Sequence, residues 1–276
     1  MRLAVYVTGR VVSRPARATG SRHGRTFCLG WPPRSSPYRV SPVRDVACTP
    51  AAEQGESVER HHQETGPQNL AAAARAAGVT DPRVLEAIRR TPRAAFVPAA
   101  YVTRAYDDAP ISIPHHQVTT QPSLSAGIIA ALGLTGVEEV FEVGTGYGYQ
   151  TALLARLAAR VVSIDIWPDL AGQASRNLAA QGIGNVVVLA GDGTEGAPDF
   201  APFDAIVVSA AYPSVPSPLA AQLRTGGRLV QPVGPGGGED VVLYEKEQDG
   251  LRRVRVVTVA SFVRLHGRHG FPLPEP

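Results

Sequence analysis

The sequence predicts an α/β fold built on a doubly wound, mostly parallel seven-stranded sheet. Three observations lead to this prediction. From residue 138 onward, apolar strand-like runs alternate with helical segments, the order typical of β-α-β units. These runs are almost continuously apolar, as expected for strands that helices cover on both faces. After Gly238, two runs that alternate apolar and polar residues flank a Gln-Asp-Gly turn, which predicts a hairpin of antiparallel strands at the C-terminal edge of the sheet.

Two helices are expected ahead of the sheet. Residues 67–79 are rich in alanine, and residues 82–90 follow Asp81, a residue type that caps helices, with a proline at the first helical position. A proline-restricted loop over residues 107–121 comes next, and a third helix is expected over residues 122–133. A long polar loop ahead of a strand often lies over a ligand.

The remaining elements follow from the apolar runs. The expected parallel strands are residues 138–143, 160–165, 185–191, 203–210 and 227–233. The helices expected between them are residues 149–159, 168–182 and 216–224. The expected edge strands are residues 239–247 and 252–263.

Composition limits the class of protein. The chain has 276 residues, of which 44% are apolar, and a net charge of +3, enough for a large core in one or two domains. Its two cysteines, Cys28 and Cys48, leave no disulfide framework. No apolar run approaches the roughly 18 to 20 residues needed to span a bilayer. We therefore expect a soluble, cytoplasmic protein that does not bind membranes.

Charge divides the chain unevenly. Residues 1–44 contain nine arginines and no acidic residue, a composition that does not fold alone. We expect residues 1–65 to be a basic, Pro/Arg-rich, disordered extension. The alternatives are a basic arm that touches nucleic acid or an acidic surface, and a start codon chosen too far upstream. The ordered domain is then expected over residues 66–276, divided into a helical and loop cap (66–135), a Rossmann-like core (136–262) and a C-terminal tail (263–276).

A glycine-rich turn follows the first expected parallel strand, in the sequence EVFEVGTGYGYQ (139–150). In sheets of this kind, ligands bind beyond the carboxyl ends of the strands, where the strand order reverses. Gly144, Gly146 and Gly148 would permit positive φ and a close approach of the ligand to the main chain, and the following helix would offer free N–H groups. A tight strand-to-helix turn without a ligand is the alternative explanation.

Acidic residues near the ends of three strands narrow the choice of ligand. Asp165 follows Gly144 by 21 residues and is placed to accept hydrogen bonds from both hydroxyls of a ribose. Asp192 could receive an adenine amino group or serve as a turn or helix cap, and Glu142 precedes the turn. NAD is disfavoured because Tyr149 replaces the third glycine of its G-x-G-x-x-G pattern, so S-adenosylmethionine is the predicted cofactor. The predicted cofactor-binding residues are Glu142, Gly144, Thr145, Gly146, Tyr147, Gly148, Asp165, Ile166, Gly191, Asp192 and Gly193.

Histidines were considered as bases and as metal ligands. His115 and His116 lie together in the loop before the third helix, where solvated or hydrogen-bonded histidines are commoner than proton-transfer groups. His266 and His269 have no cysteine or acidic partner at metal-ligand spacing, so no metal site is predicted.

Six segments in order resemble the protein-L-isoaspartate (D-aspartate) O-methyltransferase family. They are VLEAIRRTPRAAFVP, QVTTQP, VFEVGTGYGYQTALLA, GDG, APFDAIVVSAA and GGRLVQPVG. The resemblance covers about residues 81–262, and the RxxFVP motif with the loop before Pro122 is its most specific part. It implies a class I S-adenosylmethionine-dependent methyltransferase of Rossmann-like fold that methylates the α-carboxylate of L-isoaspartyl residues in damaged proteins or peptides. The methyl ester would then cyclise to a succinimide, whose hydrolysis returns some normal aspartate.

The resemblance also implies a substrate site in residues 116–122. Family members read Gly-Gln-Thr-Ile-Ser-Gln/Ala-Pro here, with the serine hydroxyl between cofactor and substrate carboxylate. Thr120 occupies the serine position and is the implied catalytic residue, with an added methyl group and a stiffer χ1. Val118 replaces the threonine of the family pattern. The implied substrate-binding residues are His116, Thr119, Gln121 and Pro122.

No general base is expected, because a carboxylate is ionised at neutral pH and alignment with exclusion of water can drive the transfer. Two alternatives stay open: methylation of a normal aspartate in one cognate biosynthetic peptide, and a non-catalytic module that binds S-adenosylmethionine or isoaspartyl protein. An NAD-dependent oxidoreductase ranks third. The expected partners are isoaspartyl proteins or peptides, with no nucleic acid, and the expected oligomeric state is a monomer.

Overall fold

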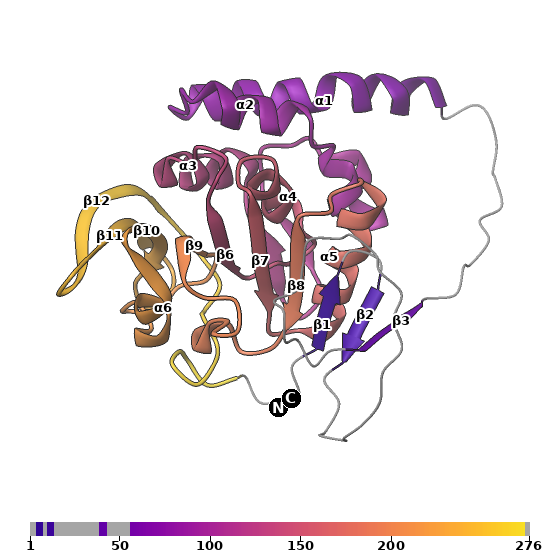
Figure 1. The fold of residues 1–276 in the computed structure, drawn as a ribbon. Coiled ribbons are helices and arrows are strands. Elements are labelled where there is room, and N and C mark those ends of the chain that lie inside the picture. Colours follow the sequence, from indigo (N-terminus) through magenta and orange to yellow (C-terminus); the bar gives the residue numbers. More distant parts are fainter. Residues whose placement is uncertain (1–3, 8–9, 14–38, 43–55, 274–276) are drawn as a thin grey trace.

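The fold is that of a computed structural model, which describes residues 4–7, 10–13, 39–42 and 56–273. One large sheet has the strand order β12-β11-β10-β9-β6-β7-β8-β1-β2-β3, as Figure 1 shows. The seven predicted strands are β6 (Glu139–Val143), β7 (Arg160–Asp165), β8 (Val186–Ala190), β9 (Phe203–Val208), β10 (Leu223–Val233), β11 (Glu239–Glu247) and β12 (Gly250–Ala260). Strands β6 to β10 are parallel, whereas β11 is antiparallel to β10 and to β12. The predicted doubly wound, mostly parallel sheet with antiparallel C-terminal strands is confirmed.

Three short strands extend this sheet beyond β8. They are β1 (Ala4–Val7), β2 (Arg10–Ser13) and β3 (Arg39–Pro42). Strand β1 pairs antiparallel with β8. Without β1, β8 would be an edge strand, and the unpaired backbone groups of an edge strand readily pair with another strand. These stretches lie in the segment expected to be a disordered extension, and composition carries no signal for such pairing. The expected boundary at residue 66 also falls inside helix α1 (Glu56–Ala76). Most of residues 1–55 lie outside the residues that the structure describes. The predicted division of the chain into an N-terminal extension and a folded domain therefore stays a prediction.

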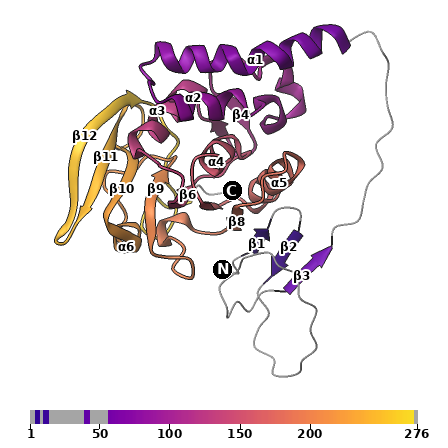
Figure 2. The same cartoon turned by 45° about the horizontal axis from the view of Figure 1, so that its top comes forward.

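Helices cover both faces of the sheet, which explains the nearly continuous apolar strands. Val140 of β6 packs into a core with helices α1 to α5, whereas its neighbour Phe141 packs into a second core that includes Leu219 of α6. Successive side chains of a strand point to opposite faces. Helix α6 accordingly lies apart from α1 to α5 in both views (Figures 1 and 2). The helices are α2 (Pro82–Arg89), α3 (Pro122–Leu132), α4 (Tyr149–Ala155), α5 (Pro168–Ala180) and α6 (Ser217–Gln222), with short 3₁₀ turns η1 (Arg93–Phe96), η2 (Ala99–Arg104) and η3 (Gly193–Glu195).

The expected helix ends agree with the structure within three residues, except at the start of α1 and at the end of α4. Helix α1 begins at Glu56, eleven residues before the expected start at residue 67. The Asp81 side chain accepts a hydrogen bond from the Arg83 N–H at 2.8 Å and caps α2. Helix α3 begins at Pro122 and is followed by Gly133 in the left-handed conformation. Helix α4 ends at Ala155, four residues before the expected end, because the backbone N–H groups of residues 159 and 160 bond to the Glu138 carbonyl at the start of the sheet.

The long proline-rich loop contains a hairpin of its own. Strands β4 (Ile111–Ile113) and β5 (Gln117–Thr119) pair antiparallel, with Ile111 opposite Thr119. At its tip, His115 and His116 have φ values of 62° and 55°, a left-handed conformation that few non-glycine residues adopt. The hairpin therefore lies between η2 and α3 as a shaped element rather than an irregular loop.

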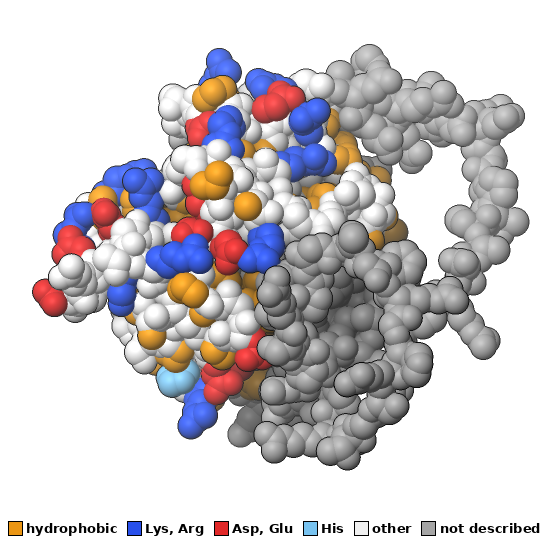
Figure 3. Space-filling model, in the orientation of Figure 1, with side chains coloured by type: hydrophobic (Ala, Val, Ile, Leu, Met, Phe, Trp, Pro, Cys, Tyr) orange, Lys and Arg blue, Asp and Glu red, His pale blue; other side chains and the backbone are white. Residues whose placement is uncertain are grey.

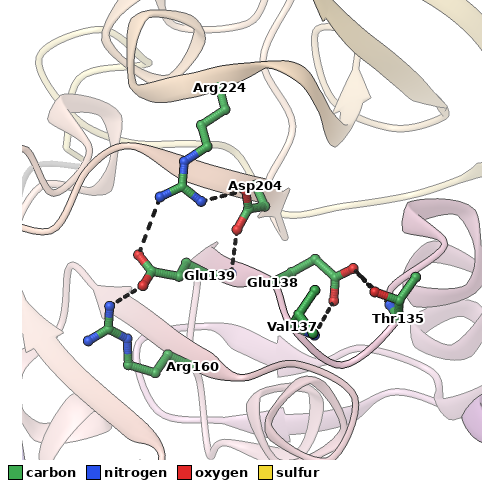
Figure 4. Close-up of polar contacts among 7 residues, drawn as sticks. All are labelled: Thr135, Val137, Glu138, Glu139, Arg160, Asp204 and Arg224. Carbon is green, nitrogen blue, oxygen red and sulfur yellow. Dashed lines mark hydrogen bonds and ion pairs between the residues drawn. The ribbon is translucent and has the colours of Figure 1, made fainter. Parts of the chain in front are cut away.

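An ion-pair network holds the amino ends of the parallel strands (Figure 4). Glu139, the first residue of β6, pairs with Arg160 at the start of β7 and with Arg224 of β10. Arg224 also pairs with Asp204 of β9, whose carboxylate accepts the Glu139 N–H at 2.8 Å. These side chains are about a third exposed, so each pair contributes little. Together these ion pairs link β6, β7, β9 and β10 at the amino ends of the strands, opposite the carboxyl ends.

The strand order reverses at β6, which lies between β7 and β9. The connections that leave the carboxyl ends of the adjacent strands β6 and β9 therefore run to opposite sides, toward β7 and toward β10, which leaves a crevice for a ligand. On the face shown in Figure 3, basic and acidic side chains are intermixed. Within the described ranges, none of the helices has both the length and the apolar character that crossing a bilayer requires.

Candidate active site

A pocket lies at the carboxyl ends of β6, β7 and β9. Residues 143–150, 164–167 and 209–210 line it from the strand ends and the start of α4. Residues 117–120, in and directly after the β4–β5 hairpin, and residues 263–266 of the C-terminal segment also line it, together with Ile113, Ser125, Leu170 and Gly193. The site therefore combines the predicted edge of the sheet with two segments distant in sequence.

The glycine turn adopts the backbone that the sequence predicts. Gly144, Gly146 and Gly148 have φ values of 94°, 56° and 91°, a region that L-residues with a Cβ rarely adopt. A Cβ atom at Gly144 would lie 3.2 Å from the Cβ of Ser209. The turn thus needs glycine for its conformation and for the close packing of β6 against β9.

Asp165 lies at the end of β7 and is 6% exposed. Its Oδ2 accepts the Gly146 N–H at 2.8 Å and its Oδ1 accepts the Trp167 N–H at 3.0 Å. Burial raises the pKa of Asp165 to about 6, although these two hydrogen bonds favour the ionised form. A carboxylate offers about four acceptor positions, so two remain for the two hydroxyls of a ribose in the pocket.

Glu142 does not line the pocket, in contrast to the expected cofactor contact. It is fully buried and accepts hydrogen bonds from Gln150 Nε2 at 3.1 Å, Thr151 Oγ1 at 2.5 Å and Ser163 Oγ at 2.6 Å. Burial raises the pKa of Glu142 to about 7 against the effect of these donors, and Asp165 adds to the increase. The physical reason is its place within β6, where α4 covers its face of the sheet.

Asp192 also does not line the pocket. Its Oδ1 accepts the N–H and hydroxyl of Thr194 at 2.8 and 2.6 Å, and its Oδ2 accepts the Arg268 N–H at 2.7 Å. Asp192 therefore caps η3 and fixes the C-terminal segment, the capping role that the sequence left open. The expected contact with an adenine amino group stays a prediction. Gly191 does not line the pocket either, since its N–H bonds the Asp165 carbonyl, whereas Gly193 does line it.

The other expected cofactor residues lie where the sequence places them. Thr145, Gly146, Tyr147, Gly148 and Ile166 all line the pocket. The Thr145 hydroxyl is hydrogen-bonded to Ser163 at 2.6 Å, so the main chain of the turn, rather than this hydroxyl, is available to a ligand.

Two of the expected substrate residues line the pocket. Thr119 is 8% exposed, and its hydroxyl oxygen accepts hydrogen bonds from Arg93 Nη2 at 2.9 Å and the Ile111 N–H at 3.2 Å. Thr120, the next residue, is partly exposed in the pocket. Thr120 thus contributes a hydroxyl-bearing side chain to the lining of the pocket.

Three expected substrate residues do not line the pocket. The Gln121 amide donates to Asp108 at 2.9 Å, and Pro122 is the first residue of α3. His116 lies at the exposed hairpin tip. After Thr120 the chain enters α3, and this turn directs residues 121 and 122 away from the pocket.

Arg93 of the RxxFVP motif shapes the substrate loop. It is completely buried, and its guanidinium donates to the carbonyls of Ala105, Asp107 and Ala109 at 2.9 to 3.2 Å as well as to Thr119. Burial lowers the pKa of Arg93 to about 10, so the group stays charged at neutral pH. The sequence motif marked this residue without indicating its role.

Several pocket residues carry no signal in the sequence. Trp167, Ser209, Arg264 and His266 line the pocket, and their positions depend on how β7, β9 and the C-terminal segment come together. Three further polar atoms in pocket-lining residues, Ser125 Oγ, Tyr149 OH and Gln150 Oε1, are buried without a hydrogen-bond partner. Orphaned polar atoms are rare in native proteins, so these atoms point to a polar ligand. Over the described residues, no three His, Cys, Asp or Glu side chains could together hold a metal ion.

Comparisons with known proteins show which family the chain belongs to. The family model described as Protein-L-isoaspartate(D-aspartate) O-methyltransferase matches residues 65–270. The protein-L-isoaspartate O-methyltransferase of Methanoculleus marisnigri is 46% identical over 197 residues, which cover 71% of this chain and 89% of the relative. That of Anaeromyxobacter dehalogenans is 48% identical over 190 residues, covering 68% and 91%.

Solved structures share the fold. A protein-L-isoaspartate O-methyltransferase superposes with a TM-score of 0.66 at 27% identity, covering 74% of this chain and 67% of that chain. A Plasmodium falciparum protein in complex with S-adenosyl-L-homocysteine superposes with a TM-score of 0.62 at 19% identity, covering 73% and 98%, a likeness that concerns the fold alone. The family match and the relatives establish that this chain belongs to the protein-L-isoaspartate(D-aspartate) O-methyltransferase family.

Proposed function

We propose that the chain is an S-adenosylmethionine-dependent carboxyl methyltransferase that acts on the α-carboxylate of L-isoaspartyl residues in damaged proteins or peptides. The observation that carries this proposal is the meeting of Asp165, the glycine turn and Thr120 in one pocket. These groups come from β7, the β6–α4 turn and the β4–β5 hairpin. With Asp165 as the proposed nucleoside-binding carboxylate and Thr120 as the proposed carboxylate-binding hydroxyl, both substrates would meet in one cavity, as transfer between them requires.

The residues present fit the cofactor. Asp165 has acceptor positions left for ribose hydroxyls, and the buried Gln150 Oε1 lacks a partner that a ligand can supply. When bound, S-adenosylmethionine supplies a methyl group: a carboxylate oxygen bonds to the carbon as the carbon–sulfur bond breaks, and the electron pair stays on sulfur as a neutral thioether. Gly144 and Gly146 allow close approach of the ligand to the main chain.

Thr120 is the residue of the hairpin suited to hold the acceptor carboxylate. Its hydroxyl can donate one hydrogen bond to a carboxylate oxygen, and Arg93 fixes the neighbouring Thr119 through a 2.9 Å hydrogen bond. The carboxylate is already ionised at neutral pH, so no side chain needs to remove a proton. Alignment by a preorganised loop and exclusion of water are therefore sufficient sources of rate enhancement.

A second substrate class is favoured by one feature of the loop. Thr120 carries a methyl group that a serine would lack, and its χ1 is stiffer. This group narrows the space beside the pocket and could favour a normal aspartyl side chain of one cognate peptide. The methyl acceptor would then be the β-carboxylate rather than the α-carboxylate.

Methanol release from matched peptides tests both functions. One peptide is made with L-isoaspartate and again with L-aspartate at the same position, and each is incubated with the protein and S-adenosylmethionine. The proposed function predicts turnover of the isoaspartyl form alone, whereas turnover of the aspartyl form alone supports the second candidate. Binding of S-adenosylhomocysteine without turnover of either form would contradict an enzymatic role on these substrates.

A further inference from the structure

One acceptor atom in the pocket is oriented by a buried network and has no partner. Gln150 lies in the first turn of α4 and is 8% exposed. Its Nε2 donates to Glu142 Oε1 at 3.1 Å and to Ser209 Oγ at 2.8 Å, while its Oε1 is buried without a hydrogen bond. Gln150 and Ser209 both line the pocket, whereas Glu142 lies behind them.

The chemistry of Glu142 decides which way the Gln150 amide faces. In its ionised form Glu142 only accepts hydrogen bonds, so the NH₂ group of the amide faces Glu142 Oε1 and also donates to Ser209. Rotating the amide by half a turn would place two oxygen atoms against each other. Glu142 is fixed in turn by the hydroxyls of Thr151 and Ser163. The atom left without a partner is therefore an acceptor, which calls for a hydrogen-bond donor from the ligand.

The position of this acceptor indicates which part of the ligand carries the donor. Asp165, suited to the ribose, lies at the end of β7 on one side of β6. Ser209 follows β9 on the other side of β6, and Gln150 bonds to it. Trp167 and Leu170, which follow β7, line the pocket with apolar side chains suited to the base of a nucleoside held at Asp165. The polar side of the pocket at Gln150 and Ser209 is then left for the 5′ substituent. In S-adenosylmethionine this substituent is the methionine part, whose strong donor is the α-ammonium group.

We propose that Gln150 Oε1 accepts a hydrogen bond from the α-ammonium group of S-adenosylmethionine, and that Glu142 is a positioning residue that acts through Gln150. The proposal rests on the proposed function, because it assumes that cofactor. It gives the acidic residue before the glycine turn a role without a direct ligand contact. It also makes the pocket selective for a nucleoside that carries an amino acid, since a nucleoside with a neutral 5′ substituent leaves Gln150 Oε1 unpaired.

Binding calorimetry with two ligands tests this role. S-adenosylhomocysteine has the ammonium group, and its deaminated analogue has hydrogen in that place. Gln150→Met keeps a similar volume and removes the amide. We expect this variant to raise the Kd of S-adenosylhomocysteine about tenfold or more, the usual cost of a lost charge-assisted hydrogen bond. The Kd of the deaminated analogue should change less than about twofold.

Matched variants separate this role from a general effect on stability. Gln231→Met removes a second buried glutamine whose Oε1 also lacks a partner, away from the pocket, and should change neither Kd. Glu142→Gln should reduce the preference for S-adenosylhomocysteine over its analogue, because the amide of Gln150 is then free to rotate. If Gln150→Met does not fold, Gln150→Asn can replace it, because its side chain is one methylene shorter and moves the amide oxygen. This variant should likewise raise the Kd of S-adenosylhomocysteine without raising that of the deaminated analogue.

Each outcome decides the proposal. Equal losses for both ligands in the Gln150 variant, or no loss for either, would overturn the assignment of Gln150 to the ammonium group. Unaltered preference in Glu142→Gln would overturn the positioning role of Glu142. If the parent protein binds neither ligand, the proposed function itself is wrong. If the parent binds both ligands, and Asp165→Asn weakens that binding while Gln150→Met does not, only this inference is wrong.

Discussion

The imidazole of His115 stacks on the indole of Trp167, with ring centroids 4.1 Å apart and planes 3° from parallel. The same imidazole places Nε2 2.9 Å from the Asp169 carboxylate in the first turn of α5. His115 is at the tip of the β4–β5 hairpin, and Trp167 follows Asp165 in the pocket wall. The contact therefore fastens the hairpin that carries Thr120 to the edge of the nucleoside site.

Replacing His115 should release this fastening. We expect His115→Ala to raise the dissociation rate of S-adenosylhomocysteine about threefold to tenfold, because a stacked pair and a partly exposed hydrogen bond are each worth about 1 kcal/mol. Stopped-flow displacement measures the rate. His116→Ala is the control, since this neighbour makes neither contact, and equal rates for parent and His115→Ala would exclude a role in cofactor retention.

The pKa of Asp165 predicts a pH dependence of cofactor binding. Its carboxyl has a folded-state pKa of about 6, raised from 3.8 by burial, and only the ionised form offers all its acceptor positions to the ribose. The affinity for S-adenosylhomocysteine should therefore fall below pH 6, by up to about tenfold per pH unit. Asp165→Asn should bind weakly at every pH with a flatter profile. Calorimetry from pH 5 to 8 makes the comparison.

The same shift fixes the sign of a stability effect. Because the folded protein binds this proton more tightly than the unfolded chain, the contribution of Asp165 to the free energy of unfolding is largest below pH 4 and is lost as the pH rises through 6. Asp165→Asn should remove that dependence. Urea unfolding at pH 4.5 and 7.5 gives the change in unfolding free energy between the two pH values. If this change were the same in Asp165→Asn as in the parent, the raised pKa of Asp165 would be contradicted.

Thr120 should matter for turnover more than for folding. Thr120→Ala removes the hydroxyl proposed to hold the substrate carboxylate, and kcat/KM for an isoaspartyl peptide should fall about 10- to 100-fold with little change in melting temperature. Thr120→Ser keeps the hydroxyl and should stay within about threefold of the parent. An isoaspartyl peptide turned over at the parent rate by Thr120→Ala would show that the loop is aligned incorrectly with the family pattern.

Arg93 should couple folding stability to peptide binding. Arg93→Met leaves the carbonyls that it holds in the loop without a donor, so we expect a loss of about 2 to 4 kcal/mol in unfolding free energy and a raised KM for the peptide. Arg156→Met is the control, because Arg156 bonds Thr91 away from the loop. An unchanged KM in Arg93→Met would show that the hydrogen bonds of Arg93 to the loop do not affect peptide binding.

Removal of residues 1–55 tests the predicted extension. The pocket-lining residues begin at Ile113, so kcat/KM should stay within about twofold of the parent. The melting temperature should fall modestly, since strand β1 pairs with β8 and its removal exposes that edge. Loss of activity in a protein that remains folded would instead make the N-terminal segment part of the functional unit.

Local patterns in the sequence determined the sheet and the turn. The apolar runs and their spacing predicted the seven strands, because strand period and helix period are properties of short segments. Gly144, Gly146 and Gly148 predicted a backbone with positive φ for the same reason, and Asp165 followed from its distance to the turn. The resemblance of the loop to one family then supplied Thr120 and the substrate class.

Tertiary structure decided where the remaining polar groups point. Glu142 is separated from Ser163 by 21 residues, Asp192 from Arg268 by 76, and His115 from Asp169 by 54. Such contacts depend on how strands and loops dock, which no short segment encodes. For this reason the sequence could propose Glu142 as a cofactor residue and leave Asp192 open between an adenine contact and a cap, whereas only packing shows that Glu142 accepts a hydrogen bond from Gln150 and that Asp192 caps η3 and holds the C-terminal segment.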